Sequence, residues 1–298
     1  MSDSFSETDL LKKIFPLIDD QPEVIVPPGD DCAVFKAGGQ NLAVTVDQVI
    51  ESRHYLPETP AALVGKKLMA RNISDIAAMG GTPRFAVLSS ASSSKEETWL
   101  LEFHKGLIEE GQKFGVTLIG GDLASTRLDT VNSLTLFGEV KKTGVLRSGA
   151  RPKHNVFVTG TLGASFESEH HLNFNPRLKE GQFLQTYAAA MIDITDGLLI
   201  DLKRICKASG ISAVIDLKSL PLRDSEGNSI QKALTDGEDY ELLFAVDEEK
   251  SESLQNDWPF STKLTMIGSF SDLGEGVILS ESGENLVDEY GEGFDHFK

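Results

Sequence analysis

The chain has 298 residues, of which 40% are hydrophobic and 25% are charged, a composition typical of an ordered globular protein. A prior of about 150 residues per domain favours two domains. The net charge of −18 argues against binding to nucleic acid or to anionic membranes, because both rest on Lys and Arg side chains that neutralise phosphate. An acidic protein binds a phosphorylated ligand when divalent cations lie between carboxylates and phosphate, so an anionic ligand would imply a metal.

The cysteines and the N-terminal residues indicate the cellular compartment. Cys32 and Cys206 have no CxxC spacing and are too few for a disulfide framework. The opening residues, MSDSFSETDLLKKIFPLI, lack the basic and apolar regions of a signal peptide. No apolar run reaches the roughly 18 residues needed to span a bilayer. We therefore expect a cytoplasmic protein with reduced thiols.

In chain order, the first half of the sequence predicts strands and helices in loose alternation. Leucine and isoleucine residues at helical spacing predict a short helix at the start, which Pro16 ends or distorts. Two short strands, Ala33–Phe35 and Leu42–Val46, follow a proline turn. The next predicted elements are a buried helix over 60–79 that stops at a glycine pair, a strand over 84–90, a helix from about 94 to 114, a strand over 116–122 that runs into a glycine turn, and a strand over 133–140.

A basic, turn-rich stretch at 141–155 separates the two halves of the chain. We place the domain boundary there, with an N-terminal domain over 1–147 and a C-terminal domain over 148–298. The second half predicts a strand over 155–159, an irregular loop near 165–180, helices near 181–191 and 197–208, and a strand over 213–217. This alternation predicts an α/β or α+β fold without fixing its topology.

The residues that could carry chemistry are mainly aspartates. The sequence contains no GxxxxGK(S/T) loop, no GxGxxG after a strand, no HExxH and no EF-hand loop. Instead, aspartates occur where apolar segments end in turns, at Asp30, Asp47, Asp75, Asp122, Asp193 and Asp196. Magnesium prefers oxygen ligands and takes one or two carboxylates together with substrate phosphate, so this set predicts a multi-metal site for phosphoryl transfer. Each aspartate also has a structural alternative, because aspartate is a common N-cap and turn residue.

Asp75, Asp193 and Asp196 are the most informative of these aspartates. Asp75 lies inside a helix-like run between two isoleucines, where an unpaired charge is costly and aspartate is a poor helix former. Asp193 and Asp196 are three residues apart and could ligate one metal. The following helix would offer backbone N–H groups to phosphate, although the same pattern is also that of a capped helix.

Basic and aromatic residues add further candidates, each with a structural alternative. Arg147 could clamp a phosphate with its planar guanidinium, or it could be a solvated surface residue. His54 could contact a phosphate or an aminopyrimidine. Glu238 and Asp239 could form only an acidic turn, and Phe294 either stacks on a ligand or holds the chain terminus in place. Two further residues, Lys66 and Lys67, are interpreted as solvated or paired helix positions.

Taken together, these segments resemble the thiamine-monophosphate kinase family, which belongs to the aminoimidazole ribonucleotide synthetase-like superfamily. The resemblance covers nearly the whole chain, in the family's order. It rests on PPGDDCAVF, TVDQVIESRHY, KLMARNISDIAAMGGTPRFAVL, IGGDLAS, RSGARP, FVTGTLGAS, MIDITDGLLIDL, ALTDGEDYELLF and GFDHF. The NISDIAAMGG run and the GEDYEL element are specific, whereas GGD is not.

The resemblance implies a fold, an assembly and site residues. The expected fold has an α/β N-terminal domain, whose strands join those of a second protomer in an intersubunit β-barrel, and an α+β C-terminal domain that closes over the active site of a homodimer. The implied magnesium ligands are Asp30, Thr45, Val46 through its carbonyl, Asp47, Asp75, Asp122, Asp193 and Asp196. Nucleotide contacts are implied at Gly121, Asp122, Arg147 and Thr195, acceptor contacts at His54, Glu238 and Phe294, and catalytic roles at Asp75, Asp122 and Asp196.

The chemistry that the resemblance implies is direct in-line transfer of the γ-phosphoryl group of ATP to thiamine monophosphate, with magnesium ions and without a phosphoenzyme. The sequence departs from the family at three positions. Thr195 keeps a hydroxyl, Asp236 adds a charge near the acceptor, and Leu123 removes a hydroxyl near the nucleotide. The stretch between Gly160 and Asp193 is also short. Two alternatives stay open, namely a synthetase of the same fold that acts on another acceptor, and a regulator that binds nucleotide without turnover.

Overall fold

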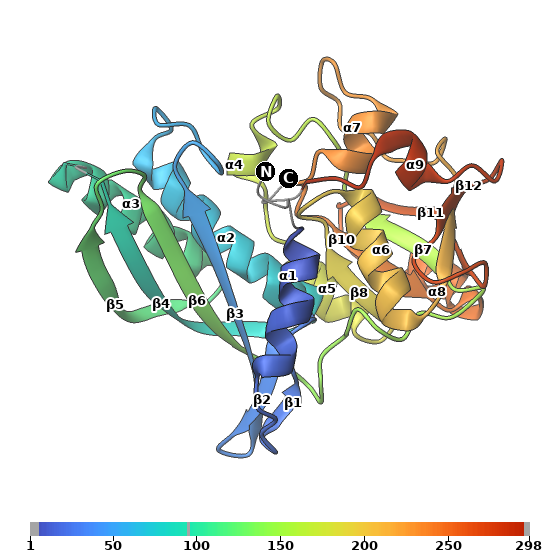
Figure 1. Cartoon of the computed structure of the whole chain (residues 1–298), viewed down its shortest axis with the longest axis horizontal. Coiled ribbons are helices and arrows are strands. Elements are labelled where there is room, and N and C mark those ends of the chain that lie inside the picture. Colours follow the sequence, from blue (N-terminus) through green and yellow to red (C-terminus); the bar gives the residue numbers. More distant parts are fainter. Residues whose placement is uncertain (1–5, 94–95, 295–298) are drawn as a thin grey trace.

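The computed structural model describes residues 6–93 and 96–294, with the backbone alone described at Thr8. This part of the chain forms two six-stranded sheets that lie side by side, one built from strands within 24–139 and the other from strands within 155–280 (Figure 1). The order is β1-β2-β3-β6-β4-β5 in the first sheet and β12-β9-β11-β7-β10-β8 in the second. The two sheets belong to successive halves of the chain, so the junction between them brings together residues that are far apart in sequence.

The first half contains the helices and strands that build the first sheet and its covering layer. They are α1 (Glu7–Ile14), the 3₁₀ helix η1 (Phe15–Leu17), β1 (Val24–Val26), β2 (Ala33–Ala37), β3 (Gln40–Ile50), α2 (Ala61–Ala78), β4 (Thr82–Ser92), α3 (Glu97–Lys113), β5 (Thr117–Ser125) and β6 (Val131–Glu139). Neighbouring strands are antiparallel except for the β4–β5 pair. Burial alternates along β6 residue by residue, as expected for a strand with one face against a core.

The second half contains the remaining elements. They are β7 (Asn155–Thr159), α4 (His170–Asn173), α5 (Leu178–Leu184), β8 (Ala188–Asp193), α6 (Leu198–Ser209), β9 (Ser212–Ile215), α7 (Ile230–Thr235), β10 (Leu242–Val246), α8 (Glu248–Asp257), β11 (Leu264–Ser271), β12 (Ile278–Ser280) and α9 (Leu286–Tyr290). Only the β12–β9 pair is parallel among the pairs described for this sheet. β10 is buried on both faces, because one core that includes α6 covers one side and a second core covers the other. The second sheet is therefore packed between two apolar cores.

Helix α2 lies at the junction of the two halves and is buried around most of its circumference (Figure 1). It packs against α3 and β3 of its own half and against α4, α5 and β8 of the other. Glycines permit the close approach to α3, because a Cβ at Gly65 would lie 2.0 Å from the Phe103 oxygen and one at Gly106 would lie 2.0 Å from the Ala62 oxygen. Polar side chains on α2 are thereby carried into a buried junction, where they need partners from both halves.

Two local predictions from the sequence are wrong. The helix expected near 181–191 ends at Leu184, and Ala188–Asp193 is instead strand β8, which pairs with β10. Three alanines favour a helix locally, but pairing with a buried strand overrides that preference. The glycine turn expected at the end of 116–122 is also absent, since β5 continues to Ser125 alongside β4. The helix expected from about 94 begins at Glu97 in the structure, and residues 94–95 lie outside the described part.

None of the described helices is long and apolar enough to cross a membrane.

Candidate functional site

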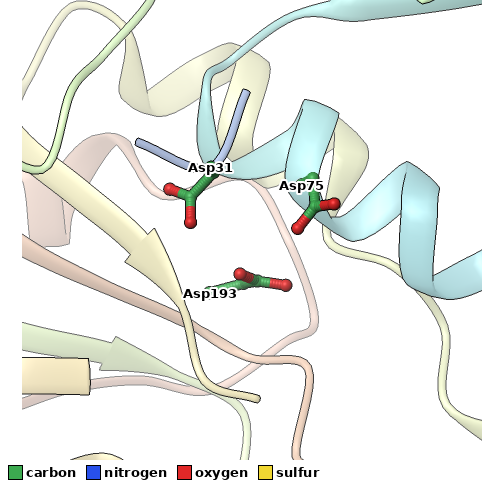
Figure 2. Close-up of side chains that lie close together, drawn as sticks. All are labelled: Asp31, Asp75 and Asp193. Carbon is green, nitrogen blue, oxygen red and sulfur yellow. The ribbon is translucent and has the colours of Figure 1, made fainter. Parts of the chain in front are cut away.

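Three carboxylates from distant parts of the sequence meet at the junction of the two halves. The side chains of Asp31, Asp75 and Asp193 offer carboxylate oxygens that all lie within 4.8 Å of one another (Figure 2). Asp31 comes from the loop between β1 and β2, Asp75 from α2, and Asp193 from the end of β8. Both halves of the chain therefore contribute to the cluster.

Neighbouring donors orient each carboxylate of the cluster. The Thr45 hydroxyl donates to Asp75 at 2.5 Å, and the Ser74 hydroxyl donates to Asp193 at 2.5 Å. Arg147 donates from Nη2 to Asp31 at 2.6 Å. The oxygens are thus held facing one another although they carry like charge, a costly arrangement that needs a compensating ligand.

The electrostatics of the cluster fit a divalent cation. Removal from water, together with the charge of neighbouring Asp30, raises the pKa of Asp31 from 3.8 to about 6. Burial, reinforced by neighbouring aspartates, raises the pKa values of Asp75 and Asp193 well above their ordinary range. A doubly charged ion reverses this penalty, and a set of carboxylate and hydroxyl oxygens is what magnesium prefers. These residues therefore fit a magnesium site.

Asp30 and Arg147 border the cluster. The Asp30 carboxylate accepts hydrogen bonds from the backbone N–H of Arg147 at 3.1 and 3.2 Å, and burial raises its pKa. Asp30 was a predicted metal ligand and Asp31 was not, although both stand in the same GDD run. Sequence spacing alone does not say which of two adjacent carboxylates points inward, whereas the structure places Asp31 in the group of three.

Of the other predicted metal ligands, Thr45 contacts the cluster through Asp75, and Asp47 lies near enough for its charge to raise the pKa of Asp75. Asp47 accepts two hydrogen bonds from Arg71, and Asp196 forms an ion pair with Arg204 at 2.7 Å. Thr45 is buried beside Asp75. Three further residues are exposed, namely Val46 on β3 and Gly121 with Asp122 on β5. β5 is the edge strand of the first sheet, and the group of three carboxylates does not include Asp122.

The three predicted acceptor residues converge on one small pocket. The pocket has a volume of ≈ 50 Å³ and is lined by Arg53, His54, Arg71, Phe166, Thr195, Asp196, Asp236, Glu238 and Phe294. A second pocket of ≈ 590 Å³ shares Arg53, His54 and Arg71 with it and is also lined by Val46 and Asp47. The predicted acceptor contacts thus lie together, next to residues predicted to bind metal. Residues 295–297 of the terminal GFDHF motif lie outside the described part.

Lys67 and Arg71 of α2 bond residues around the acceptor pocket. Neither was predicted from the sequence as a site residue. Lys67 is fully buried, forms an ion pair with Glu238 and donates to the His54 oxygen at 2.6 Å. Burial lowers its pKa to about 8. Arg71 bonds Asp47 through Nε and Nη2, each at 3.2 Å. The available signal was their spacing, since Lys67, Arg71 and Asp75 follow at four-residue intervals and so share one face of the helix.

The turn that presents Glu238 has an unusual backbone. Glu238 has φ of 55° and Tyr240 has φ of 50°, a left-handed conformation that residues with a Cβ rarely adopt. Asp239 between them is buried and accepts hydrogen bonds from the Gly163 N–H, the Ser165 hydroxyl and Arg223. These bonds hold the turn in its strained form, so that Glu238 points toward Lys67.

Two family models match successive parts of the chain. The model described as AIR synthase related protein, N-terminal domain, matches residues 29–140, and the model for the C-terminal domain matches residues 142–258. The thiamine-monophosphate kinase of Haemophilus influenzae is 32% identical over 99% of this chain and 99% of its own length. The Bacillus subtilis thiamine-monophosphate kinase is 32% identical over 98% of this chain and 99% of its own length.

Solved structures resemble the whole chain. The structure described as AaThiL complexed with AMPPCP and TMP, from a chain 28% identical, has a TM-score of 0.86 and covers 98% of this chain and 97% of its own. The thiamine-monophosphate kinase of Stenotrophomonas maltophilia is 27% identical with a TM-score of 0.76, covering 95% of this chain and 98% of its own. The hydrogenase maturation protein HypE, 17% identical with a TM-score of 0.69 and covering 90% of this chain and 92% of its own, shares the fold.

Proposed function

Because the chain belongs to the thiamine-monophosphate kinase family, we propose that it transfers the γ-phosphoryl group of ATP to thiamine monophosphate and forms thiamine diphosphate. One observation carries the proposal. The cluster of Asp31, Asp75 and Asp193 and the pocket that contains His54 and Glu238 lie at the same junction between the halves. The relative described as a complex with AMPPCP and TMP supports a site for a nucleotide and an acceptor.

The proposal assigns magnesium to the acidic side of the junction. Asp31, Asp75 and Asp193 would hold it, and the proposed ligand set extends to Asp30, Thr45, Val46 through its carbonyl, Asp47, Asp122 and Asp196. When bound, magnesium supplies the positive charge that neutralises the phosphates. Arg147, Thr195 and Gly121 are the proposed nucleotide contacts, and Asp75, Asp122 and Asp196 are the proposed catalytic residues.

The reaction requires the protein to position the two substrates, and it does not require a nucleophile or a base from the protein. At neutral pH a phosphate monoester is mostly a dianion, since its second pKa is about 6, so its attacking oxygen has no proton to lose. A bond forms between that oxygen and the γ-phosphorus, while the bond from the γ-phosphorus to the β–γ bridging oxygen breaks. ADP leaves with the electron pair. The acceptor is held in line with this bond by His54, Glu238 and Phe294. The oriented carboxylates of the cluster, which would hold magnesium at the phosphates, fit such a reaction.

The direct test is a turnover assay. Purified protein is incubated with ATP, magnesium and thiamine monophosphate, and ADP and thiamine diphosphate are measured. We expect both products in equal amounts. ATP consumption that requires a different acceptor would instead indicate a synthetase of the same fold, and nucleotide binding without any turnover would indicate a regulator.

We also propose a homodimer formed through the first sheet. Val46 and Phe85 are 62% and 49% exposed on the sheet face opposite α2 and α3, and Ile119 and Leu123 are 60% and 67% exposed on edge strand β5. Exposed apolar side chains beside an unpaired strand edge are typical of a sheet that continues into another subunit. A dimer of this kind would place Gly121 and Asp122 at the interface.

Phe85→Asp tests this assembly. We expect wild-type protein to sediment at twice the chain mass of 32.4 kDa and the variant to sediment as a monomer, because a charge would be buried in the interface. Leu101→Asp is the matched control, since Leu101 is 60% exposed on α3, away from this face. A wild-type monomer, or a Phe85→Asp dimer, would contradict the proposed interface.

We further propose that the protein works in the cytoplasm. Cys32 and Cys206 are both buried and unpaired, as expected for a chain that is not exposed to disulfide-forming conditions.

A further inference from the structure

One face of α2 connects the acidic cluster to the acceptor pocket. Lys67, Arg71 and Asp75 are spaced by four residues, so their Cα atoms rise about 6 Å per step along the same side of the helix. Asp75 belongs to the carboxylate cluster, Arg71 lines the small pocket, and Lys67 pairs with Glu238. Arg71 therefore stands between the proposed positions of the triphosphate and the acceptor.

The guanidinium of Arg71 has unused hydrogen-bonding capacity. Its Nε and Nη2 atoms donate to Asp47. Its Nη1 atom is buried and has no hydrogen-bond partner among the described residues, and Glu238 Oε1 is 3.7 Å away. The residue as a whole is only 9% exposed. A buried N–H group without an acceptor is costly, and a donor of this kind in a pocket wall indicates a ligand that accepts the bond.

The charges around the pocket favour an anion at this donor. Among the carboxylates that line the pocket, Glu238 is paired closely with Lys67 and, at 3.7 Å, with Arg71 Nη1, and Asp196 is paired with Arg204. The Asp236 carboxylate accepts from the Ala164 N–H. Asp47 fixes the guanidinium plane from the opposite side. Arg71 thus lines the pocket with its guanidinium plane fixed by Asp47, and a guanidinium in a fixed orientation suits the paired oxygens of a phosphate.

We propose that Arg71 binds the phosphate of the acceptor, an assignment that rests on the proposed kinase function. The acceptor oxygen must come within about 3–3.5 Å of the γ-phosphorus, so the acceptor phosphate lies beside the acidic cluster. Arg71 lies one helical turn from Asp75 on α2, and so next to that phosphate. Phe166 and Phe294 line the same pocket and are 48% and 44% exposed. Their rings would contact the heterocyclic part of the acceptor.

The experiment compares a ligand that has the phosphate with one that lacks it. Binding of thiamine monophosphate and of thiamine is measured calorimetrically, with magnesium and a non-hydrolysable ATP analogue present, for the wild type, Arg71→Met, Arg71→Lys and Arg53→Met. The readout is the ratio of the two Kd values. We expect Arg71→Met to lower the preference for the phosphorylated ligand about 10- to 100-fold, the size of a lost bond to a charged group. Arg71→Lys should retain part of it.

Several results would overturn the assignment. An unchanged ratio in Arg71→Met, with both ligands weakened equally, would mean that Arg71 only positions Asp47 and Glu238. Loss of the ratio in Arg53→Met instead would assign the phosphate to the exposed arginine of the same pocket. If Arg71→Met does not fold by circular dichroism, Arg71→Gln replaces it, and an unchanged ratio there is equally adverse. A wild type that prefers the phosphorylated ligand without turning it over contradicts the kinase function alone, whereas a wild type with no preference contradicts the assignment.

Discussion

Asp75→Asn is expected to lower kcat by about 10³-fold and to leave the fold intact, because it removes one charge from a preorganised electrostatic site. Asparagine has nearly the same shape, and its side-chain oxygen still accepts the bond that the Thr45 hydroxyl donates at 2.5 Å. The pKa of Asp75 is raised mainly by burial and further by Asp47, Asp193 and Asp31, so the carboxylate form does not stabilise the folded chain. The measurement pairs steady-state kinetics with thermal unfolding in magnesium-free buffer.

The control for this variant is Asp272→Asn, which removes an exposed carboxylate just beyond β11. It should leave both kcat and Tm unchanged. For Asp75→Asn, Tm in magnesium-free buffer should be equal to or above that of the wild type. Near-normal turnover would remove Asp75 from the catalytic centre, and a large fall in Tm would assign it a structural role instead.

Without magnesium, the wild-type protein is expected to lose stability as the pH rises from about 4 through 6 and beyond. The folded state raises the pKa of Asp31 from 3.8 to about 6, so the protonated form is favoured by folding. The contribution of Asp31 to the free energy of unfolding is fully present below its pKa in the unfolded state. It is lost as the pH rises through its pKa in the folded state. The pKa shifts of Asp75 and Asp193 have the same sign, so ionisation of the whole cluster lowers the free energy of unfolding as the pH rises.

Adding magnesium should reverse this loss, because an ion binds the ionised carboxylates of the folded state and shifts unfolding by mass action. The increase in Tm on adding magnesium should therefore be larger at pH 8 than at pH 5. Asp193→Asn is the matched variant, since its oxygen can still accept from the Ser74 hydroxyl. Sodium chloride at equal ionic strength controls for general screening of the −18 charge. An equal magnesium effect at both pH values, or in both proteins, would argue against an ion at this cluster.

Much of the first half could be predicted from the sequence because its signals are local. Helix α2 was predicted over 60–79 and spans Ala61–Ala78, since apolar spacing and a glycine pair mark both its face and its end. The strand predicted over 155–159 coincides with β7. The segment Ala188–Asp193 was predicted as helix for an equally local reason. Its strand conformation depends on pairing with β10, about fifty residues later in the chain, and such a partner leaves no local signal.

The sequence predicted that aspartates form the candidate site, but not which carboxylates face one another or which side chains pair with them. The aspartates named from the sequence include Asp75 and Asp193, whose carboxylate oxygens the structure places within 4.8 Å of each other. The choice between Asp30 and Asp31 depends on which carboxylate turns inward, and both carboxylates are bonded by Arg147, which lies more than a hundred residues away. Lys67 was interpreted as a solvated or paired helix position. Only the tertiary structure shows that its partner is Glu238 of the other half.

The strained turn around Glu238 sets two requirements on the sequence against each other. Left-handed backbone at Glu238 and Tyr240 costs on the order of 1–2 kcal/mol for each residue with a Cβ. Glycine or asparagine at position 238 would adopt this conformation with less strain, but neither supplies the carboxylate that meets Lys67. Removing the carboxylate would also leave the fully buried Lys67 ammonium without its partner, which costs more than the strain that is relieved. Engineered thermostable forms should keep Glu238 and seek their added stability elsewhere in the chain.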